Sequence, residues 1–152
     1  MRLYLVQHGR AVDSAQDPAR PLSDDGRREV ESVASIVRRF ALPVSRIEHS
    51  GKLRARQTAE VLAAVLEPPS GIHERSGLAP RDDVTELVRL GLVPDQLMLV
   101  GHLPFLERLA GLLLVGDPER CIYRMQNAGI LALERAAEGD WSIRWAVTPN
   151  LD

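Results

Sequence analysis

Two of the four histidines, His8 and His102, follow short apolar runs, residues 3–6 and 97–100. Imidazole is the side chain best suited to act as a nucleophile or to carry a proton near neutral pH. A short apolar run bounded by polar or turn residues predicts a buried strand. Because open α/β sheets keep their ligand crevices at the carboxyl ends of strands, we expect the two imidazoles to face one another across one crevice.

Arg54 is a candidate for holding an anion in that crevice. Residues 53–66 predict a helix, so the Arg54 guanidinium and the free backbone N–H groups of the first turn can grip one anion. Ser50, just before this helix, either offers a hydroxyl to the anion or helps the helix to begin. Zinc needs three or four ligands, and no third ligand joins the two histidines at a recognisable spacing. The sequence therefore predicts an anion site with neither a metal ion nor a cofactor.

Apolar periodicity and turn residues divide the chain into alternating strands and helices. Strands are predicted near residues 3–6, 45–50, 72–75, 97–100, 129–134 and 141–147, and helices over 24–41, 53–66, 84–90 and from 104 onward. The polar segment 11–22, with its two prolines, is predicted to be a surface loop beside the crevice. Strands that alternate with helices favour a three-layer α/β/α fold with a mainly parallel central sheet.

The first two helices are expected to pack on the sheet through apolar stripes. Ser23 can cap the first helix, whose stripe is Val30, Val33, Ala34, Val37 and Ala41. The stripe of the second helix is Leu53, Val61, Leu62, Val65 and Leu66. Each set recurs at steps of three and four residues or multiples of them, which is typical of an amphipathic helix.

Length and composition predict one ordinary globular domain, residues 1–152. The 152 residues are 45% hydrophobic and 26% charged with a net charge of −2, which gives no reason to expect nucleic acid or an anionic membrane as a partner. Cys121 is the single cysteine and cannot form an internal disulfide. No apolar run reaches the roughly 18 residues that a membrane span needs. We therefore predict a cytoplasmic protein.

Four stretches carry a resemblance to a known family. They are residues 7–9 (Gln-His-Gly), 21–26 (Pro-Leu-Ser-x-x-Gly), 50–58 (Ser-x-x-x-Arg-Ala-x-Gln-Thr) and 101–104 (Gly-His-Leu-Pro). In this order they resemble the motifs of the histidine phosphatase superfamily, and within it the compact SixA-type phosphohistidine phosphatase branch. The resemblance implies a phosphoglycerate mutase-like fold and a phosphatase that forms a phosphohistidine intermediate.

The resemblance also implies roles for single residues. His8 matches the nucleophile, His102 the second catalytic histidine and Arg54 the phosphate-binding arginine, with Gly9 and Ser50 beside the phosphate. Gln7 stands where the family has an arginine, and an amide keeps an N–H donor but loses the charge and the two-pronged grip. That loss costs about 1.5–3 kcal/mol, or one to two decades in rate, so we expect Gln7→Arg to raise activity.

The general acid is the least defined part of the predicted site. Asp83, or its neighbour Asp82, is the nearest candidate, although either can equally cap a helix. A phosphohistidine substrate needs little help from an acid, because the leaving imidazole is readily protonated on nitrogen. The connection between residue 66 and Pro80 is short, so no long insertion covers the crevice. Both points favour phosphate presented on a protein surface.

The leading hypothesis is therefore a metal-independent phosphatase that acts on a phosphohistidine-bearing protein, such as a phosphotransfer domain, and releases phosphate. One alternative is a phosphomonoesterase acting on a small metabolite, which would need the carboxylic acid. The other is a module that binds phosphate or a phosphoprotein and whose catalysis lapsed with the arginine at position 7.

Overall fold

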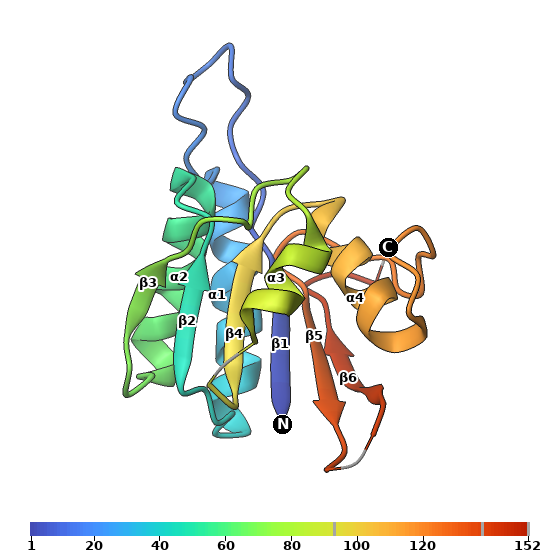
Figure 1. The fold of residues 1–152 in the computed structure, drawn as a ribbon. Coiled ribbons are helices and arrows are strands. Elements are labelled where there is room, and N and C mark those ends of the chain that lie inside the picture. Colours follow the sequence, from blue (N-terminus) through green and yellow to red (C-terminus); the bar gives the residue numbers. More distant parts are fainter. Residues whose placement is uncertain (93, 138, 152) are drawn as a thin grey trace.

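A six-stranded sheet lies between two pairs of helices in the computed structural model, which describes residues 1–92, 94–137 and 139–151 (Figure 1). The strands are β1 Arg2–Gln7, β2 Arg46–His49, β3 Ile72–Glu74, β4 Leu97–Gly101, β5 Ile130–Arg135 and β6 Trp141–Val147. The helices are α1 Asp24–Arg39, α2 Leu53–Leu66, α3 Val84–Leu90 and α4 Phe105–Val115. Each predicted element is present, with ends shifted by a few residues at most.

The strand order is β3-β2-β4-β1-β5-β6. The first four strands in this order run parallel, whereas β5 pairs antiparallel with β1 and β6 antiparallel with β5. The last two strands therefore form a hairpin at one edge of the parallel part. The predicted α/β fold with a mainly parallel sheet is confirmed.

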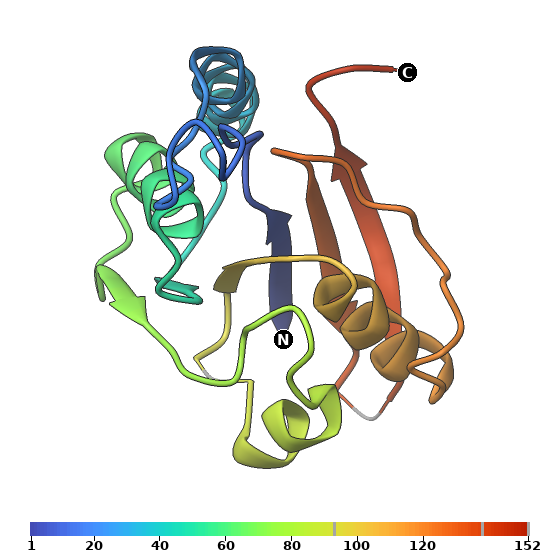
Figure 2. The ribbon, with the colours of Figure 1, turned by 90° about the horizontal axis from the view of Figure 1, so that it is seen from above.

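Helices cover both faces of the sheet, as the view from above shows (Figure 2). The side chains of β1 alternate between the two faces: Tyr4 and Val6 join the core beneath α1 and α2, and Leu3 and Leu5 join the core beneath α3 and α4. All four are at most 1% exposed. Burial on both faces is why β1 is continuously apolar rather than alternating.

The pairing of β1 with β4 fixes the position of the two histidines. The strands are parallel and in register, with Gln7 opposite Gly101. His8 and His102 are the next residues in each strand direction, so the chain leaves the sheet at both points on the same edge. This edge is the upper one in Figure 1, opposite the N-terminus.

Two predicted helix faces need correction. Ala41 is exposed because α1 ends at Arg39 and the backbone turns left-handed at Ala41, with φ of +46°. In α2 the buried residues are small ones and Leu62, namely Ala55, Thr58, Ala59 and Leu62, while Leu53, Val61, Val65 and Leu66 are only partly buried. Small side chains let α2 approach its neighbours closely. The hydrophobic pattern alone therefore does not predict which face of α2 is buried.

The segment between β1 and α1 forms a narrow loop that rises above the histidine edge (Figure 1). Its base is closed by a bridge between Ala11 and Leu22 and by the bond from Val12 N–H to Pro21 O at 2.9 Å. The predicted surface loop is therefore present, and its base lies next to His8.

Among the described residues, no helix combines the length and the apolar character that crossing a bilayer requires.

Candidate active site

His8 is held in one neutral form by its neighbours. Its Nδ1 lies 2.7 Å from the carbonyl oxygen of Gly9, and a carbonyl can only accept, so Nδ1 carries the proton. The lone pair is therefore on Nε2, where it accepts a bond from Nε of Arg54 at 3.3 Å. The backbone is fixed as well, because His8 N–H donates to Gly101 O and the side-chain amide of Asn127 donates to His8 O. The unprotonated nitrogen thus points into the site.

His102 lies against His8, with ring centroids 4.9 Å apart. The ring is almost completely buried, at 2% exposure. Its Nε2 is 2.6 Å from the hydroxyl of Ser50, while its Nδ1 is buried without a hydrogen-bond partner. Ser50 follows β2 directly, so three neighbouring strands contribute to the site.

Arg54 is the fourth residue of the site. It is the second residue of α2, and its Nε lies 3.3 Å from His8 Nε2. The helix starts without a side-chain cap, so the first backbone N–H groups stay available beside the guanidinium. The structure therefore brings together His8, His102, Arg54 and Ser50, which the sequence had placed in one crevice.

Burial keeps both imidazoles uncharged. It lowers the pKa of His8 from its usual 6.5 to about 4, against a smaller opposing effect of the bond to Gly9 and with further lowering by Arg54 and Arg20. For His102, burial is the largest cause, and electrostatic interactions with His8, Arg54, Lys52 and Arg20 add to it, so that the pKa falls to about 3. The pKa of Arg54 is also lowered, by burial and by Arg20. Near neutral pH the site thus presents neutral imidazoles among permanent cations.

One hydroxyl ties the segment after β1 to α2. Thr58, fully buried, accepts from Gly9 N–H at 3.0 Å and donates to the carbonyl of Arg54 at 2.8 Å. Thr58 is the last residue of the motif at 50–58. Its two bonds make it the link that sets His8 and Arg54 relative to each other.

Two glycines allow the loop after β1 to lie tightly against α1. A Cβ at Gly9 would come within 2.7 Å of the Val30 side chain, and a Cβ at Gly26 would overlap the carbonyl of Arg10. Gly9 therefore serves close packing, and the amide N–H of Gly9 is already used by Thr58. The structure does not offer this N–H as a free donor for phosphate.

Gln7 has lost the grip that an arginine could provide. Its backbone joins Gly129 and Ala128, but its side-chain oxygen is buried without a hydrogen-bond partner. The side-chain oxygen is therefore an unsatisfied acceptor, and the uncharged amide brings no positive charge to an anionic oxygen.

The two candidate acids are occupied as helix and turn caps. Asp83 is exposed and accepts from Thr85 N–H as the N-cap of α3, and Asp82 accepts from Ala79 N–H. Among the described residues neither carboxylate contacts an imidazole of the site or Arg54. The structure thus gives Asp83 a capping bond and does not bring it to the other predicted site residues.

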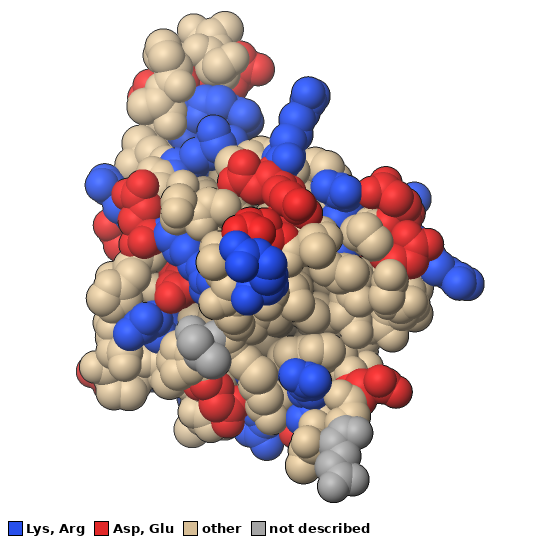
Figure 3. All heavy atoms as spheres, in the orientation of Figure 1, with Lys and Arg blue, Asp and Glu red and all other residues tan. Residues whose placement is uncertain are grey.

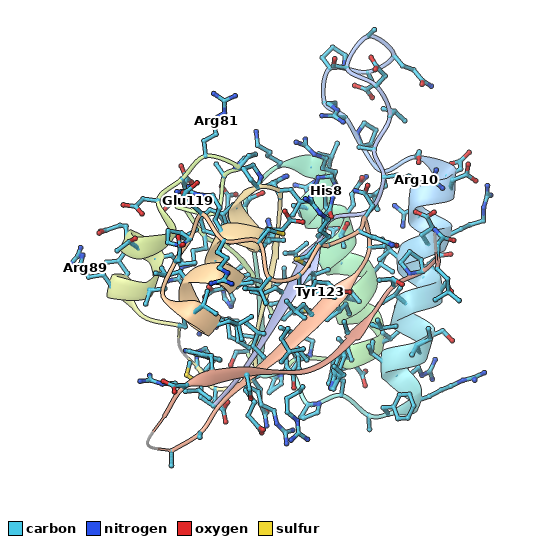
Figure 4. All side chains as sticks on the ribbon, turned by 90° about the vertical axis from the view of Figure 1, so that its right-hand side faces the viewer. His8, Arg10, Arg81, Arg89, Glu119 and Tyr123 are labelled. Atoms are coloured by element: carbon cyan, nitrogen blue, oxygen red, sulfur yellow. The ribbon has the colours of Figure 1, made fainter. Side chains whose placement is uncertain are left out.

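Three residues near the site were not predicted from the sequence, namely Arg20, Lys52 and Asn127. The charges of Arg20 and Lys52 lower the pKa of His102. Asn127 donates a hydrogen bond to the backbone carbonyl of His8. No spacing rule points to them, although Arg20 immediately precedes the motif at 21–26. Arg10, by contrast, lies over α1 and apart from His8 (Figure 4), where it pairs with Glu29.

The described residues include no cluster of three or more His, Cys, Asp or Glu side chains placed to hold a metal ion. The chemistry available to this site is that of two neutral imidazoles, a hydroxyl and fixed positive charge.

Comparison with known proteins places this arrangement in a family. The family model described as histidine phosphatase superfamily (branch 1) matches residues 3–82. An uncharacterized protein of Picosynechococcus sp. strain PCC 7002 is 37% identical over 146 residues, which cover 90% of this chain and 87% of that protein. Phosphohistidine phosphatase SixA of Escherichia coli K12 is 26% identical over 161 residues, covering 98% and 94%.

Solved structures agree with this relationship. The structure of the protein histidine phosphatase SixA complexed with tungstate superposes with a TM-score of 0.80, at 25% identity, and the match covers 98% of this chain and 97% of that one. The family model spans the nucleophile motif and the helix that carries Arg54, and the structural match extends over the whole fold. This chain belongs to the histidine phosphatase superfamily, branch 1.

Proposed function

We propose that the protein removes phosphate from phosphohistidine on another protein, through a phosphohistidine intermediate at His8. The observation that carries the proposal is the state of His8: its unprotonated Nε2 points at Arg54, 3.3 Å away, while Nδ1 is held by Gly9. A neutral imidazole with a fixed tautomer beside a guanidinium is arranged to attack an anionic phosphoryl group.

In the first step the lone pair of His8 Nε2 forms a bond to phosphorus. The bond from phosphorus to the substrate imidazole breaks, and that imidazole leaves after taking a proton from solvent. Arg54 and the uncapped start of α2 hold the phosphoryl oxygens, and when the phosphoryl group is bound His102 donates Nε2–H to them in place of the Ser50 hydroxyl. Preorganised donors of this kind act where charge is concentrated in the transition state.

In the second step a water molecule attacks phosphorus. The bond from phosphorus to Nε2 breaks, the electron pair returns to the imidazole, and the proton of the water passes to solvent or to the departing phosphate. Phosphate leaves and His8 is again neutral. Burial favours this outcome, because it lowers the pKa of His8 to about 4 and so disfavours a protonated resting state.

The choice of phosphohistidine over an alkyl phosphate rests on the two candidate acids, neither of which bonds to His8, His102 or Arg54 within the described residues. Asp82 and Asp83 cap backbone N–H groups instead. An alkoxide leaving group needs a proton donor, whereas an imidazole accepts a proton readily from solvent. The similarity to SixA, named a phosphohistidine phosphatase, supports the same substrate class.

The test uses a histidine-phosphorylated phosphotransfer domain as substrate and follows phosphate release by wild type and by His8→Asn. His73→Asn is the matched control, since His73 is an exposed histidine on β3. We expect release by wild type and by the control, and none by His8→Asn. Rapid quenching should show wild type carrying one phosphoryl group that is labile to acid and maps to His8.

Other outcomes lead to the alternative functions. Rapid hydrolysis of alkyl phosphates with a carboxylic acid in the pH profile would indicate a phosphomonoesterase. Phosphate binding without any phosphorylated His8 would indicate a module that binds but does not turn over. Equal release by wild type and His8→Asn would remove His8 from the mechanism.

A further inference from the structure

We propose that Arg20, in the loop between β1 and α1, binds the phosphoryl group and supplies the permanent positive charge that position 7 lacks. This inference rests on the proposed function for the kinetic part of its test only, because anion binding can be measured without turnover.

The fold places Arg20 at the rim of the site. The bridge between Ala11 and Leu22 closes the base of the loop, and Arg20 is two residues beyond it. Leu22 N–H donates to the side chain of Gln57, which ties the returning strand of the loop to α2 one turn after Arg54. From above, the loop lies between α2 and the end of β1 (Figure 2). The backbone next to Arg20 is thus tied to α2 on one side and to the segment that follows His8 on the other.

The guanidinium of Arg20 has no carboxylate partner among the described residues. Its Nε donates to Val12 O at 3.2 Å, which anchors the side chain along the loop and leaves both terminal nitrogens for another acceptor. Arg54 is the one other arginine of the described residues that is partly buried and has no carboxylate partner, because the remaining unpaired arginines are exposed. The arginines that pair with Asp or Glu are Arg2, Arg10, Arg28, Arg46, Arg56, Arg75, Arg89, Arg108 and Arg144. Arg20 is also only partly exposed. A half-buried cation without a counter-ion is energetically costly, and binding an anion removes part of that cost.

The backbone conformation of Arg20 also supports a role in ligand binding. Its φ of +48° is left-handed, a conformation that is strained for a residue with a Cβ. The loop nevertheless fixes Arg20 there, through Arg20 N–H to Asp17 O and Val12 N–H to Pro21 O. The strained residue is therefore held in place by its surroundings, as is common for residues that contact a ligand.

The charge of Arg20 also acts on the groups of the site. Arg20 lowers the pKa of His8, His102 and Arg54, and no carboxylate among the described residues raises any of the three. Figure 3 shows basic side chains gathered at the base of the projecting loop. Cations that repel one another without compensation create a positive potential suited to a phosphoryl group.

Because position 7 holds a glutamine, the site needs positive charge from another residue, which Arg20 can supply. The Gln7 amide carries no charge, and its buried oxygen has no hydrogen-bond partner. Arg54 alone leaves much of the charge of a phosphoryl group unbalanced, and the free terminal nitrogens of Arg20 can form a two-pronged bond to it.

The first experiment measures tungstate binding by calorimetry for wild type, Arg20→Met and Arg20→Lys. The control is Arg56→Met, which removes an exposed arginine of α2 paired with Glu60. We expect Arg20→Met to bind tungstate about tenfold more weakly or worse, Arg20→Lys to lie between, and the control to match wild type. Equal affinity of Arg20→Met and wild type overturns the proposal. If Arg20→Met does not fold, Arg20→Gln replaces it under the same criterion.

The second experiment follows phosphohistidine hydrolysis in a cycle of wild type, Gln7→Arg, Arg20→Met and the double variant. We expect Gln7→Arg to raise kcat/KM by a larger factor in the Arg20→Met background than in wild type, because one charge then replaces the other. Equal factors in both backgrounds contradict the proposal. Should wild type bind tungstate through Arg20 but release no phosphate, the proposed function fails while the role of Arg20 stands.

Discussion

The residues of the site are organised to keep two imidazoles neutral beside arginines. Burial is the main cause for both His8 and His102, and the nearby cations add to it. A neutral His8 suits the proposed attack at physiological pH, but its burial costs stability in acid, because the unfolded chain binds a proton more readily than the folded one.

We predict that stability falls as the pH drops below 6.5. The pKa of His8 is about 4 in the folded protein against 6.5 when exposed, so between these values the unfolded chain binds more protons and unfolding becomes easier. From pH 7 to pH 5 His8 alone should lower the free energy of unfolding by about 2 kcal/mol. Urea unfolding of wild type and His8→Gln at both pH values checks this. The same loss in both proteins would contradict it.

Ser50 is expected to orient His102. Its hydroxyl is 2.6 Å from Nε2, and the other ring nitrogen is buried without a partner, so within the described residues Ser50 holds the ring alone. Ser50→Ala should therefore lower kcat/KM for phosphohistidine about tenfold, the effect of one hydrogen bond of about 1.4 kcal/mol. Ser50→Thr, which keeps a hydroxyl, should retain most of the rate. An Ala variant as active as wild type would show that His102 needs no such support.

At the scale of elements, the site depends on how firmly α2 is attached to the loop after β1. Thr58 makes both bonds of that attachment, one to Gly9 N–H and one to the carbonyl of Arg54. The helix thus sets the position of Arg54 and also that of the backbone next to His8.

Replacing Thr58 by valine should break this attachment. The volume is nearly unchanged, but Gly9 N–H is left buried without an acceptor, which costs about 1–3 kcal/mol in the free energy of unfolding. We also expect kcat/KM to fall, because His8 and Arg54 lose their mutual positioning. Thermal or urea unfolding and phosphate release measure the two effects. Thr58→Ser should restore both, and a stable, fully active Thr58→Val would rule out the link.

The sequence predicted the elements well wherever the signal was local. The apolar runs located β1 and β4, Ser23 was correctly chosen as the cap of α1, and the limits of α2 agree with the structure. The sequence-based prediction was wrong about which face of α2 is buried, because that face depends on the elements that pack against it. The buried face of α2 is built on Ala55, Ala59 and Thr58, because closeness to a neighbour outweighs hydrophobicity there.

The same division holds for the candidate site. His8, His102, Ser50 and Arg54 follow strand ends or begin a helix, so topology alone could place them together. Arg20 and Asn127 belong to loops, and their positions depend on how those loops fold back on the sheet. The hydrophobic periodicity of the sequence does not predict how these loops fold, so only the structure shows that Arg20 and Asn127 lie near the site.

At the scale of the molecule, the site lies at one edge of the sheet and has only a short chain segment near it from the α2 side. Residues 67–83, between α2 and α3, contain only the short strand β3. We infer that a phosphate carried on a protein can reach His8 and that a small phosphorylated molecule gains few enclosing contacts.

Substrate size should therefore affect the rate. We expect kcat/KM for a phosphohistidine-bearing phosphotransfer domain to exceed that for free phosphohistidine by at least about tenfold, since surface contacts around the site add binding energy only to the protein. Parallel assays of the two substrates measure the ratio. Equal values would favour an enzyme for small molecules.

The reaction should also proceed without a divalent metal ion. The phosphoryl group can be held by arginines, imidazole and backbone N–H groups, which supply the charge that Mg²⁺ would otherwise provide. Prolonged treatment with EDTA, followed by assay in metal-free buffer, should leave phosphate release unchanged. Restoration of a lost activity by Mg²⁺ or Zn²⁺ would contradict the proposed mechanism.

The contact of Gly26 with the carbonyl of Arg10 bears on how this enzyme type can diversify. Any side chain at that point would push the segment after His8 away from α1. A relative that carries alanine or serine there would have to route this segment differently. One position on α1, packed against the segment after His8, is therefore expected to separate chains that keep this pocket geometry from chains that do not.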